Sequence, residues 1–326
     1  MMLSALRCGC GIFLLALVAT NSRADETADP QQLLAQMARA MRELDYDGSF
    51  IYEHDSRVDT LRVFHAGGVE ERERLISLNG ARREVVRNSR SITSVQPNQL
   101  PTVFSAESNR RLVPLVPDAR AEGLQENYTL RLIAEDRIAG FSAQVIDVQA
   151  KDKYRYSYRL WLEKNSHLLL RSILLDADQH SLQQLMFVAL NIGGRVNETD
   201  LALSEVPAKT IAAQAQEVLL TTPSEWALGE LPAGFRMGAR RGPADASSVG
   251  AEHWLLSDGV ASVSVYLEPA NTAPGVLTQG KISRGVLNVF VRNLNGYQVT
   301  ALGEVPPATV EKIADALTHT EPGVAH

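Results

Sequence analysis

Cysteine is nearly absent from this chain of 326 residues: only Cys8 and Cys10 occur, both within the first ten positions. They precede a short apolar run, Gly11–Thr20, and a small-x-small sequence that ends at Ala24. This pattern predicts a secretory signal peptide over residues 1–24, so the exported chain would contain no cysteine. A chain without cysteine excludes disulfides, metal–thiolate sites and a cysteine nucleophile. Because both cysteines precede the apolar run, a lipid anchor on either of them is also excluded.

Long apolar runs are missing as well. The run in the signal peptide is shorter than the roughly 20 residues that a membrane-spanning helix needs, and no later segment is longer. We therefore expect a soluble exported protein. Loss of Arg7 and Arg23 with the signal peptide lowers the 32 basic residues to 30 against 38 acidic ones, which changes the net charge from −6 to −8. This negative excess argues against nucleic-acid binding.

Motifs for catalysis and cofactor binding are also missing. The sequence has no nucleophile elbow and no glycine-rich phosphate loop, and its seven histidines are scattered without metal-ligand spacing. Asp45 and Asp47 flank a tyrosine and would point the same way on a strand, as an acid–base pair requires. Beside Gly48, however, we favour the interpretation that they cap a turn. We expect no enzyme activity, no cofactor and no metal site.

The main feature that is present is a series of four strand-like segments between residues 137 and 193. They are Ala143–Gln149, Tyr154–Glu163, His167–Leu175 and Gln183–Ile192. The polar breaks between them are too short for a crossover helix, so the pattern predicts an antiparallel meander. Alternation gives the second strand one face that carries Trp161 among polar residues and one apolar, aromatic face. The apolar face consists of Tyr156, Tyr158, Leu160 and Leu162. A sheet with such a face needs a cover or a ligand.

One helix and about five strands precede this meander. Asp29 as cap and Pro30 at the first position start a helix that apolar residues continue to Leu44. Strands are expected at Ser49–His54, Thr60–Ala66, Val69–Asn79, Arg82–Arg87 and Ile92–Gln96. Prolines then interrupt the apolar segment Pro97–Gln125, which favours short helices or loops lying over the sheet. The helix and this segment would cover a half-open barrel.

The composition changes after Gly193 and Gly194, which indicates a second domain. The predicted divisions are an N-terminal domain over 25–197, a polar linker over 198–220, a C-terminal domain over 221–318 and a frayed tail over 319–326. The second domain contains a strand-like run, Val260–Glu268, and a closing helix that begins at Pro307. The predicted fold class is α+β: a large curved antiparallel sheet, unclosed and covered by helices, followed by a smaller α+β domain.

Arginines gather between residues 72 and 111, and two interpretations of them stay open. Arginine binds phosphates and carboxylates bidentately, which suits an anionic head group or an acidic peptide. A solvated face paired with neighbouring glutamates is the simpler alternative. Two interpretations also stay open for the aromatic residues of the meander: they pack in the core, or they line a cavity for an acyl chain. The candidate lipid- or anion-binding residues are Arg82, Arg83, Arg87, Tyr156, Tyr158 and Trp161.

Several motifs, taken in order along the chain, resemble the MucB/RseB family. In the first domain they are DYDGSFIY (Asp45–Tyr52), NGARREVVR (Asn79–Arg87) and the stretch from Arg137 to Ser172. In the second they are LPAGF (Leu231–Phe235), SDGVASVSVYLEP (Ser257–Pro269) and ALGEVPPATVEKIADAL (Ala301–Leu317). No single motif is chemically diagnostic, but their joint order is specific and spans nearly the whole exported chain.

The resemblance implies a periplasmic negative regulator of the envelope-stress sigma factor, with an N-terminal domain like the carriers LolA and LolB. It implies binding to the periplasmic domain of a single-pass anti-sigma factor, which would be shielded from regulated proteolysis. Binding of lipid or lipopolysaccharide would release that partner. A periplasmic lipid or lipoprotein carrier is the alternative, although it leaves the second domain without a role. A hydrolase would need a nucleophile and a base that the sequence does not display, and self-association into a homo-oligomer is left open.

Overall fold

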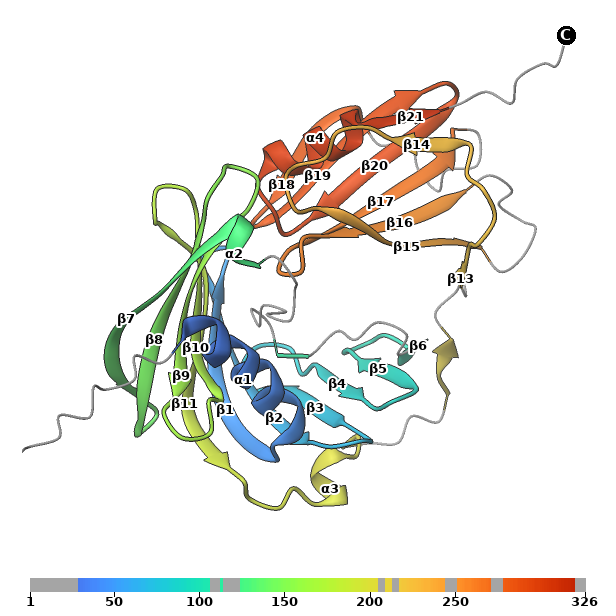
Figure 1. Ribbon diagram of the computed structural model, residues 1–326. Helices are drawn as coiled ribbons and strands as arrows, with labels where there is room; N and C mark the ends of the chain where they lie inside the picture. The colour runs from blue at the N-terminus through green and yellow to red at the C-terminus, as the bar shows by residue number, and fades with distance from the viewer. Residues whose placement is uncertain are drawn as a thin grey trace, which may run out of the picture.

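The computed structural model describes residues 29–105, 112–113, 124–204, 209–212, 217–243, 251–270 and 278–319. The expected signal peptide and most of the predicted tail lie outside this range. Two large antiparallel sheets dominate the fold, one in each half of the chain (Figure 1). The predicted α+β class, with an unclosed sheet and a smaller second domain, is confirmed.

The first helix, α1 (Pro30–Glu43), begins and ends nearly where the sequence predicts. The Asp29 side chain accepts a hydrogen bond from the backbone of Gln31 at 3.1 Å, and Pro30 occupies the first turn, where its missing N–H has no partner to lose. Its buried residues recur at helical spacing and pack in the main core. They are Leu33, Leu34, Met37, Ala38, Ala40 and Met41. The helix itself lies over one face of the large sheet (Figure 1).

The large sheet has 12 strands in the order β12-β6-β5-β4-β3-β2-β1-β11-β10-β9-β8-β7. The strands are β1 (Tyr46–His54), β2 (Arg57–Ala66), β3 (Arg72–Ser77), β4 (Glu84–Arg87), β5 (Ser91–Val95), β6 (Thr102–Ser105), β7 (Tyr128–Ile138), β8 (Phe141–Ala150), β9 (Ser157–Glu163), β10 (Leu169–Leu175), β11 (Ser181–Ile192) and β12 (Ile211–Ala212). Neighbours pair antiparallel except β12 with β6, which are parallel. The predicted meander is confirmed as β8 to β11.

Two elements of this sheet differ from the prediction. β7, which pairs along β8 and ends the sheet, was not predicted. Short helices or loops were predicted for the proline-interrupted segment, yet Thr102–Ser105 forms β6 beside β5. Because β6 lies near the other end of the sheet, with only the two-residue β12 beyond it, neighbouring prolines are tolerated there. A short helix, α2 (Leu124–Asn127), leads into β7.

The two faces of the meander carry separate apolar clusters. We call the face covered by α1 the inner face and the opposite one the outer face. Leu160 lies opposite Ile146 on the inner face, and both are fully buried in the main core. Trp161 lies opposite Val145 on the outer face, in a smaller cluster. The alternation predicted for this strand is confirmed.

The segment predicted as a linker, 198–220, attaches to both sheets where it is described. It contains α3 (Glu198–Leu201), β12 beside β6, and β13 (Glu217–Leu219), which pairs with β15 (Arg236–Pro243) of the second sheet. Glu198 also forms a bidentate ion pair with Arg72. More contacts therefore involve this segment than its polar composition suggests, and the exact domain boundary stays a prediction.

The second sheet has seven strands in the order β13-β15-β16-β17-β20-β19-β18, with α4 against one face. Its remaining elements are β16 (Glu252–Ser257), β17 (Ser262–Pro269), β18 (Gly280–Arg284), β19 (Leu287–Leu294), β20 (Tyr297–Gly303) and α4 (Pro307–Asp315). A separate pair, β14 (Trp226–Leu228) and β21 (Leu317–His319), lies beside α4 (Figure 1). The strand and closing helix predicted for this domain are present.

Candidate binding site

The inner face of the first domain is an apolar site filled by the protein itself. Tyr46, Phe50 and Phe187 pack there with α1, and the Phe50 and Phe187 ring centroids lie 5.4 Å apart. Val113, from the segment between β6 and α2, is 2% exposed in the same cluster. An apolar ligand that entered this face would therefore have to displace protein side chains.

A charged row crosses the inner face next to this core. Cross-strand pairing places Tyr46 opposite His65, His65 opposite Glu73, and Glu73 opposite Arg87. The Arg87 guanidinium lies 2.6 Å from Glu71 Oε1 and 3.0 Å from Glu73 Oε2, and its side chain is only 8% exposed. Arg87, one of the predicted anion-binding residues, is thus ion-paired with two carboxylates of the protein itself.

Glu71 is held ionised by the same row. Burial opposes its charge, but hydrogen bonds and charge from His65 and Arg87 outweigh burial and lower the pKa of Glu71 to about 2. The His65 ring, fully buried and stacked on Tyr46, has Nδ1 2.8 Å from the Leu44 carbonyl and Nε2 3.1 Å from Glu71 Oε1. Each ring nitrogen of His65 therefore lies within hydrogen-bond distance of an oxygen atom.

The arginines of the adjacent hairpin lie elsewhere. Arg83 is half-exposed and lies 3.4 Å from Asp59, and Arg82 lies 3.8 Å from Glu84. Arg82 also lines a pocket of about 270 Å³ together with Glu84, Val95, Gln96 and Pro97. Strand alternation puts Glu84 and Val95 on the outer face, so this pocket does not open onto the inner core.

The predicted aromatic residues also lie at different places in the fold. Tyr158 packs against the inner core, and burial followed by the charge of Glu304 raises its pKa. Trp161, on the outer face, donates from Nε1 to Asp136 at 2.8 Å, and the Arg171 guanidinium lies 4.4 Å from its ring centroid. The structure therefore does not bring Trp161 together with Tyr158 in one cavity.

Tyr156 belongs to an interface between the two domains. Its hydroxyl receives a hydrogen bond from Asn288 Nδ2 at 3.3 Å, and the neighbouring Tyr154 carbonyl receives one from the Thr309 hydroxyl at 2.7 Å. Asn288 lies in β19 and Thr309 in α4, so both contacts join the β8–β9 loop to the second domain. This position differs from the cavity lining that we predicted for Tyr156.

Arg155 is the centre of this interface, and it was not among the predicted site residues. Its Nη1 lies 3.4 Å from Asp258 Oδ2, and both side chains are fully buried. Its Nη2 donates to the carbonyl of Ala233, and its guanidinium lies 5.6 Å from the ring centroids of both Tyr128 and Phe235. Tyr128 belongs to the first core and Phe235 to the second, so Arg155 contacts both domains at once.

The backbone of the second domain also approaches the first closely. A Cβ built on Gly285 would lie 1.9 Å from Asp55 Oδ1, and one built on Gly234 would lie 2.0 Å from Asn127 Nδ2. Both glycines also have positive φ, so glycine suits these turns both because it lacks a Cβ and because it adopts this backbone conformation without strain. The motif LPAGF, which contains Gly234, was noticed for its resemblance to the family. Its contact with Asn127 could not be predicted, because the alternation of side chains carries no information on residues so far apart in the chain.

Two groups of acidic residues are explained by turns and pairing. Asp45 Oδ1 accepts from the backbone of Gly67 at 2.9 Å, and Asp47 pairs with Arg62 at 2.7 Å. Asp45 thus binds the backbone of the β2–β3 turn, which agrees with a capping role, whereas Asp47 lies within β1 and pairs with a neighbouring strand instead of capping a turn.

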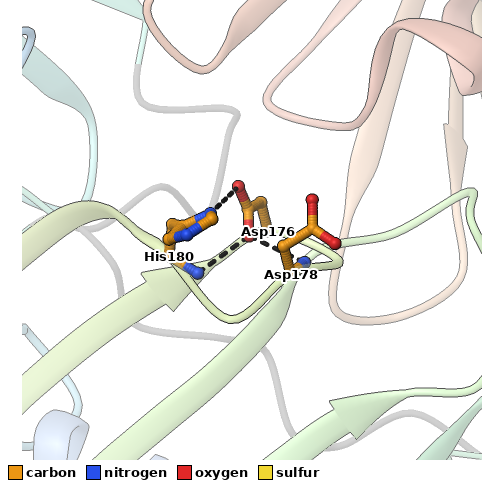
Figure 2. Close-up of side chains that lie close together, drawn as sticks. All are labelled: Asp176, Asp178 and His180. Carbon is orange, nitrogen blue, oxygen red and sulfur yellow. Dashed lines mark hydrogen bonds and ion pairs between the residues drawn. The ribbon is translucent and has the colours of Figure 1, made fainter.

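The second group, Asp176, Asp178 and His180, lies in the β10–β11 turn (Figure 2). The candidate ligand atoms of these three residues lie within 4.8 Å of one another. Asp176 Oδ1 accepts from the backbone N–H groups of Asp178 and His180 at 2.9 and 2.8 Å, which is the pattern of an aspartate that forms a turn. The turn accounts for the cluster, and the absence of a metal site stays a prediction.

Within the described residues, no helix is both long and apolar enough to cross a membrane. The MucB/RseB N-terminal domain family matches residues 29–209, and the MucB/RseB C-terminal domain family matches residues 221–318. Sigma factor AlgU regulatory protein MucB of Pseudomonas aeruginosa is 32% identical over 306 residues, which cover 89% of this chain and 91% of that protein. Sigma-E factor regulatory protein RseB of Escherichia coli (strain K12) is 29% identical over 301 residues, which cover 90% and 92%.

Solved structures agree with these relatives. One chain of the complex structure of Pseudomonas aeruginosa MucA/MucB superimposes with a TM-score of 0.67 and 26% identity, over 90% of this chain and 100% of that chain. A crystal structure of MucB in complex with MucA(peri) gives a TM-score of 0.66 with the same identity and coverage. The matches extend through both domains in the order that the motifs predict, and the chain belongs to the MucB/RseB family.

Proposed function

We propose that this protein is a periplasmic negative regulator of the envelope-stress sigma factor pathway. It binds the periplasmic region of a transmembrane anti-sigma factor and shields it from regulated proteolysis. Lipid or lipopolysaccharide, bound by the first domain, releases that partner. The protein acts by binding and carries out no chemical reaction.

The observation that carries this proposal is the likeness over both domains to a MucB seen in complex with MucA(peri). The two domains of this chain are joined by buried polar contacts as well as by the linker, which is consistent with a partner that engages both. Export fits the predicted signal peptide, and the N-terminal sequence of the periplasmic form should begin at Asp25. A membrane-retained form acylated at Cys8 would contradict export as a soluble protein.

The inner face of the first domain supports the lipid part of the proposal. It is a large apolar surface on a curved sheet, and its cover includes α1, Val113 and Val260 rather than a second sheet. Displacing part of that cover would give acyl chains an apolar surface. Arg82 and Arg83 are the better candidates for an anionic head group, because Arg87 is held by Glu71 and Glu73.

Calorimetry with the exported chain, residues 25–326, tests the proposal. We expect it to bind the periplasmic region of Pseudomonas aeruginosa MucA, and we expect saturating purified lipopolysaccharide to weaken that binding. Typical couplings of 1–3 kcal/mol correspond to about a 5- to 150-fold change in affinity. Absence of MucA binding would contradict the regulatory function.

The lipid carrier is the second candidate, favoured only by the apolar inner face. A carrier would transfer a fluorescent phospholipid between vesicles at a rate that does not depend on the MucA region. Transfer without any MucA binding would replace the regulator by the carrier. If lipopolysaccharide does not change the affinity for MucA, the protein shields its partner without responding to lipid.

A further inference from the structure

We propose that the turn between β16 and β17, Ser257–Ala261, transmits occupancy of the first domain's apolar core to the contact between the domains. We call it the coupling turn. The inference rests on the proposed function, because it names the element through which lipid would release the partner. It follows from three features of this turn: where its apolar side chains pack, how its aspartate is bound, and what that aspartate holds.

The coupling turn places adjacent side chains in different domains. Val260 packs against the core of the first domain, whereas the next residue, Ala261, packs against the core of the second. Val260 is thus an apolar contribution of the second domain to the core that α1 covers. An acyl chain that enters this core competes with Val260 for the same apolar contacts.

Asp258 fixes the shape of the turn. Its Oδ1 accepts hydrogen bonds from the backbone N–H groups of Val260 at 2.9 Å and Ala261 at 2.7 Å. Aspartate commonly binds its own backbone in this way, and the carboxylate then moves with the turn. A displacement of Val260 is therefore also a displacement of Asp258.

The other oxygen of Asp258 holds the first domain. Oδ2 accepts from the Tyr128 hydroxyl at 3.2 Å and lies 3.4 Å from Arg155 Nη1. Both Arg155 and Asp258 are fully buried in this contact, so the attraction must first offset their loss of hydration. The ion pair is longer than a close charge-assisted hydrogen bond, so its net contribution to holding the two domains together is modest.

Separation would leave Arg155 with a counter-charge in its own domain. Asp152, in the same β8–β9 loop, lies 3.3 Å from Arg155 Nε and has a side chain that is 30% exposed. Arg155 therefore has a partner in both arrangements: Asp258 and Asp152 when the domains are closed, and Asp152 with water when they part. An element with two satisfied arrangements is what a ligand can bias through differential affinity.

The test uses the absence of cysteine from the exported chain. Ser181 and Ala227 are exposed, one in each domain. Changing both to cysteine allows spin labels to be attached at these two positions alone, and pulsed electron resonance then measures the distance between the domains. Each variant is measured without ligand and with purified lipopolysaccharide, and its affinity for the MucA periplasmic region is measured in parallel.

Two substitutions separate the two halves of the proposal. Asp258→Asn keeps an acceptor for the turn but removes the charge opposite Arg155, so the labels should move apart without lipopolysaccharide and MucA affinity should fall at least about fivefold. Val260→Ala shortens the side chain in the first core. It should bind lipopolysaccharide as the wild type does, while both the distance change and the loss of MucA affinity shrink to less than half.

The control is Ala261→Ser, beside Val260 but facing the second core, which should respond to lipopolysaccharide as the wild type does. Asp258→Asn that stays closed, or Val260→Ala with a full response, would overturn the coupling turn while leaving the proposed function intact. A wild type whose MucA affinity ignores lipopolysaccharide would overturn lipid-driven release, and the coupling turn with it. Circular dichroism confirms that each variant is folded.

Discussion

Removing Arg87 should destabilise the first domain far more than removing its neighbour Arg83. The Arg87 guanidinium lies within 3.0 Å of carboxylates of both Glu71 and Glu73, and the exposed fractions of these three side chains are 8%, 18% and 1%. In Arg87→Gln the two carboxylates lose this cation, while Glu73 stays buried and Glu71 stays partly buried. Breaking a buried pair by removing one partner typically costs about 3–5 kcal/mol.

Arg83→Gln is the matched control, because it removes the same group from the same hairpin. Arg83 is 50% exposed and has its carboxylate partner, Asp59, at 3.4 Å. Exposed pairs of this kind contribute about 0–1 kcal/mol. The free energy of unfolding is measured by urea titration at pH 7, followed by tryptophan fluorescence and circular dichroism.

A second substitution tests whether the unpaired charge is the cause. Glu73→Gln added to Arg87→Gln removes the buried carboxylate that Arg87 held, so the double variant should be more stable than Arg87→Gln alone. A loss in Arg87→Gln within about 1 kcal/mol of that in Arg83→Gln would refute the buried network. A double variant less stable than the single one would refute the charge explanation.

Two further predictions concern acid stability and the outer face. The pKa of Glu71 is lowered from 4.5 to about 2, so its contribution to stability is complete above about pH 4.5 and is lost as pH falls toward 2. The difference corresponds to at most about 3 kcal/mol, and Glu71→Gln should show correspondingly less loss in urea titrations between pH 5 and pH 2. An equally steep loss in the variant would show that other groups control acid unfolding. Trp161→Phe should bind lipopolysaccharide with an affinity within about twofold of the wild type by equilibrium dialysis, because the indole packs on the outer face with Asp136 and Arg171; a larger loss would place lipid on that face.

The local elements of this fold could be predicted because their signals lie within short stretches of sequence. The Asp29–Pro30 start fixes α1, and the two-residue period between Ala143 and Ile192 fixes the meander. β7 was missed because Arg131, Glu135, Asp136 and Arg137 interrupt its alternation. As the last strand of the sheet, β7 is exposed along most of its length and tolerates those charges.

The candidate site could be predicted only in part, because charge alone does not reveal burial. The arginine-rich hairpin suggested either a head-group site or a solvated face, and Arg87 fits neither: it is buried between carboxylates. Alternation along the segment Tyr154–Glu163 would place Arg155 on the polar face with Trp161. Arg155 lies instead before β9 begins, and its partner Asp258 follows it by more than a hundred residues. Periodicity describes how a strand faces its own sheet and carries no information on such distant pairs.

The fit between the two domains favours a regulator over a carrier. Gly234 and Gly285 allow the second domain to approach Asn127 and Asp55 at distances that a side chain would block. The second domain supplies two of the partners of buried Arg155, Asp258 and the Ala233 carbonyl. A carrier needs an inner face that opens to lipid, and the first domain could provide that alone. A second domain that places an apolar side chain in the same core can sense whether the core is occupied, which is what a regulator released by lipid requires.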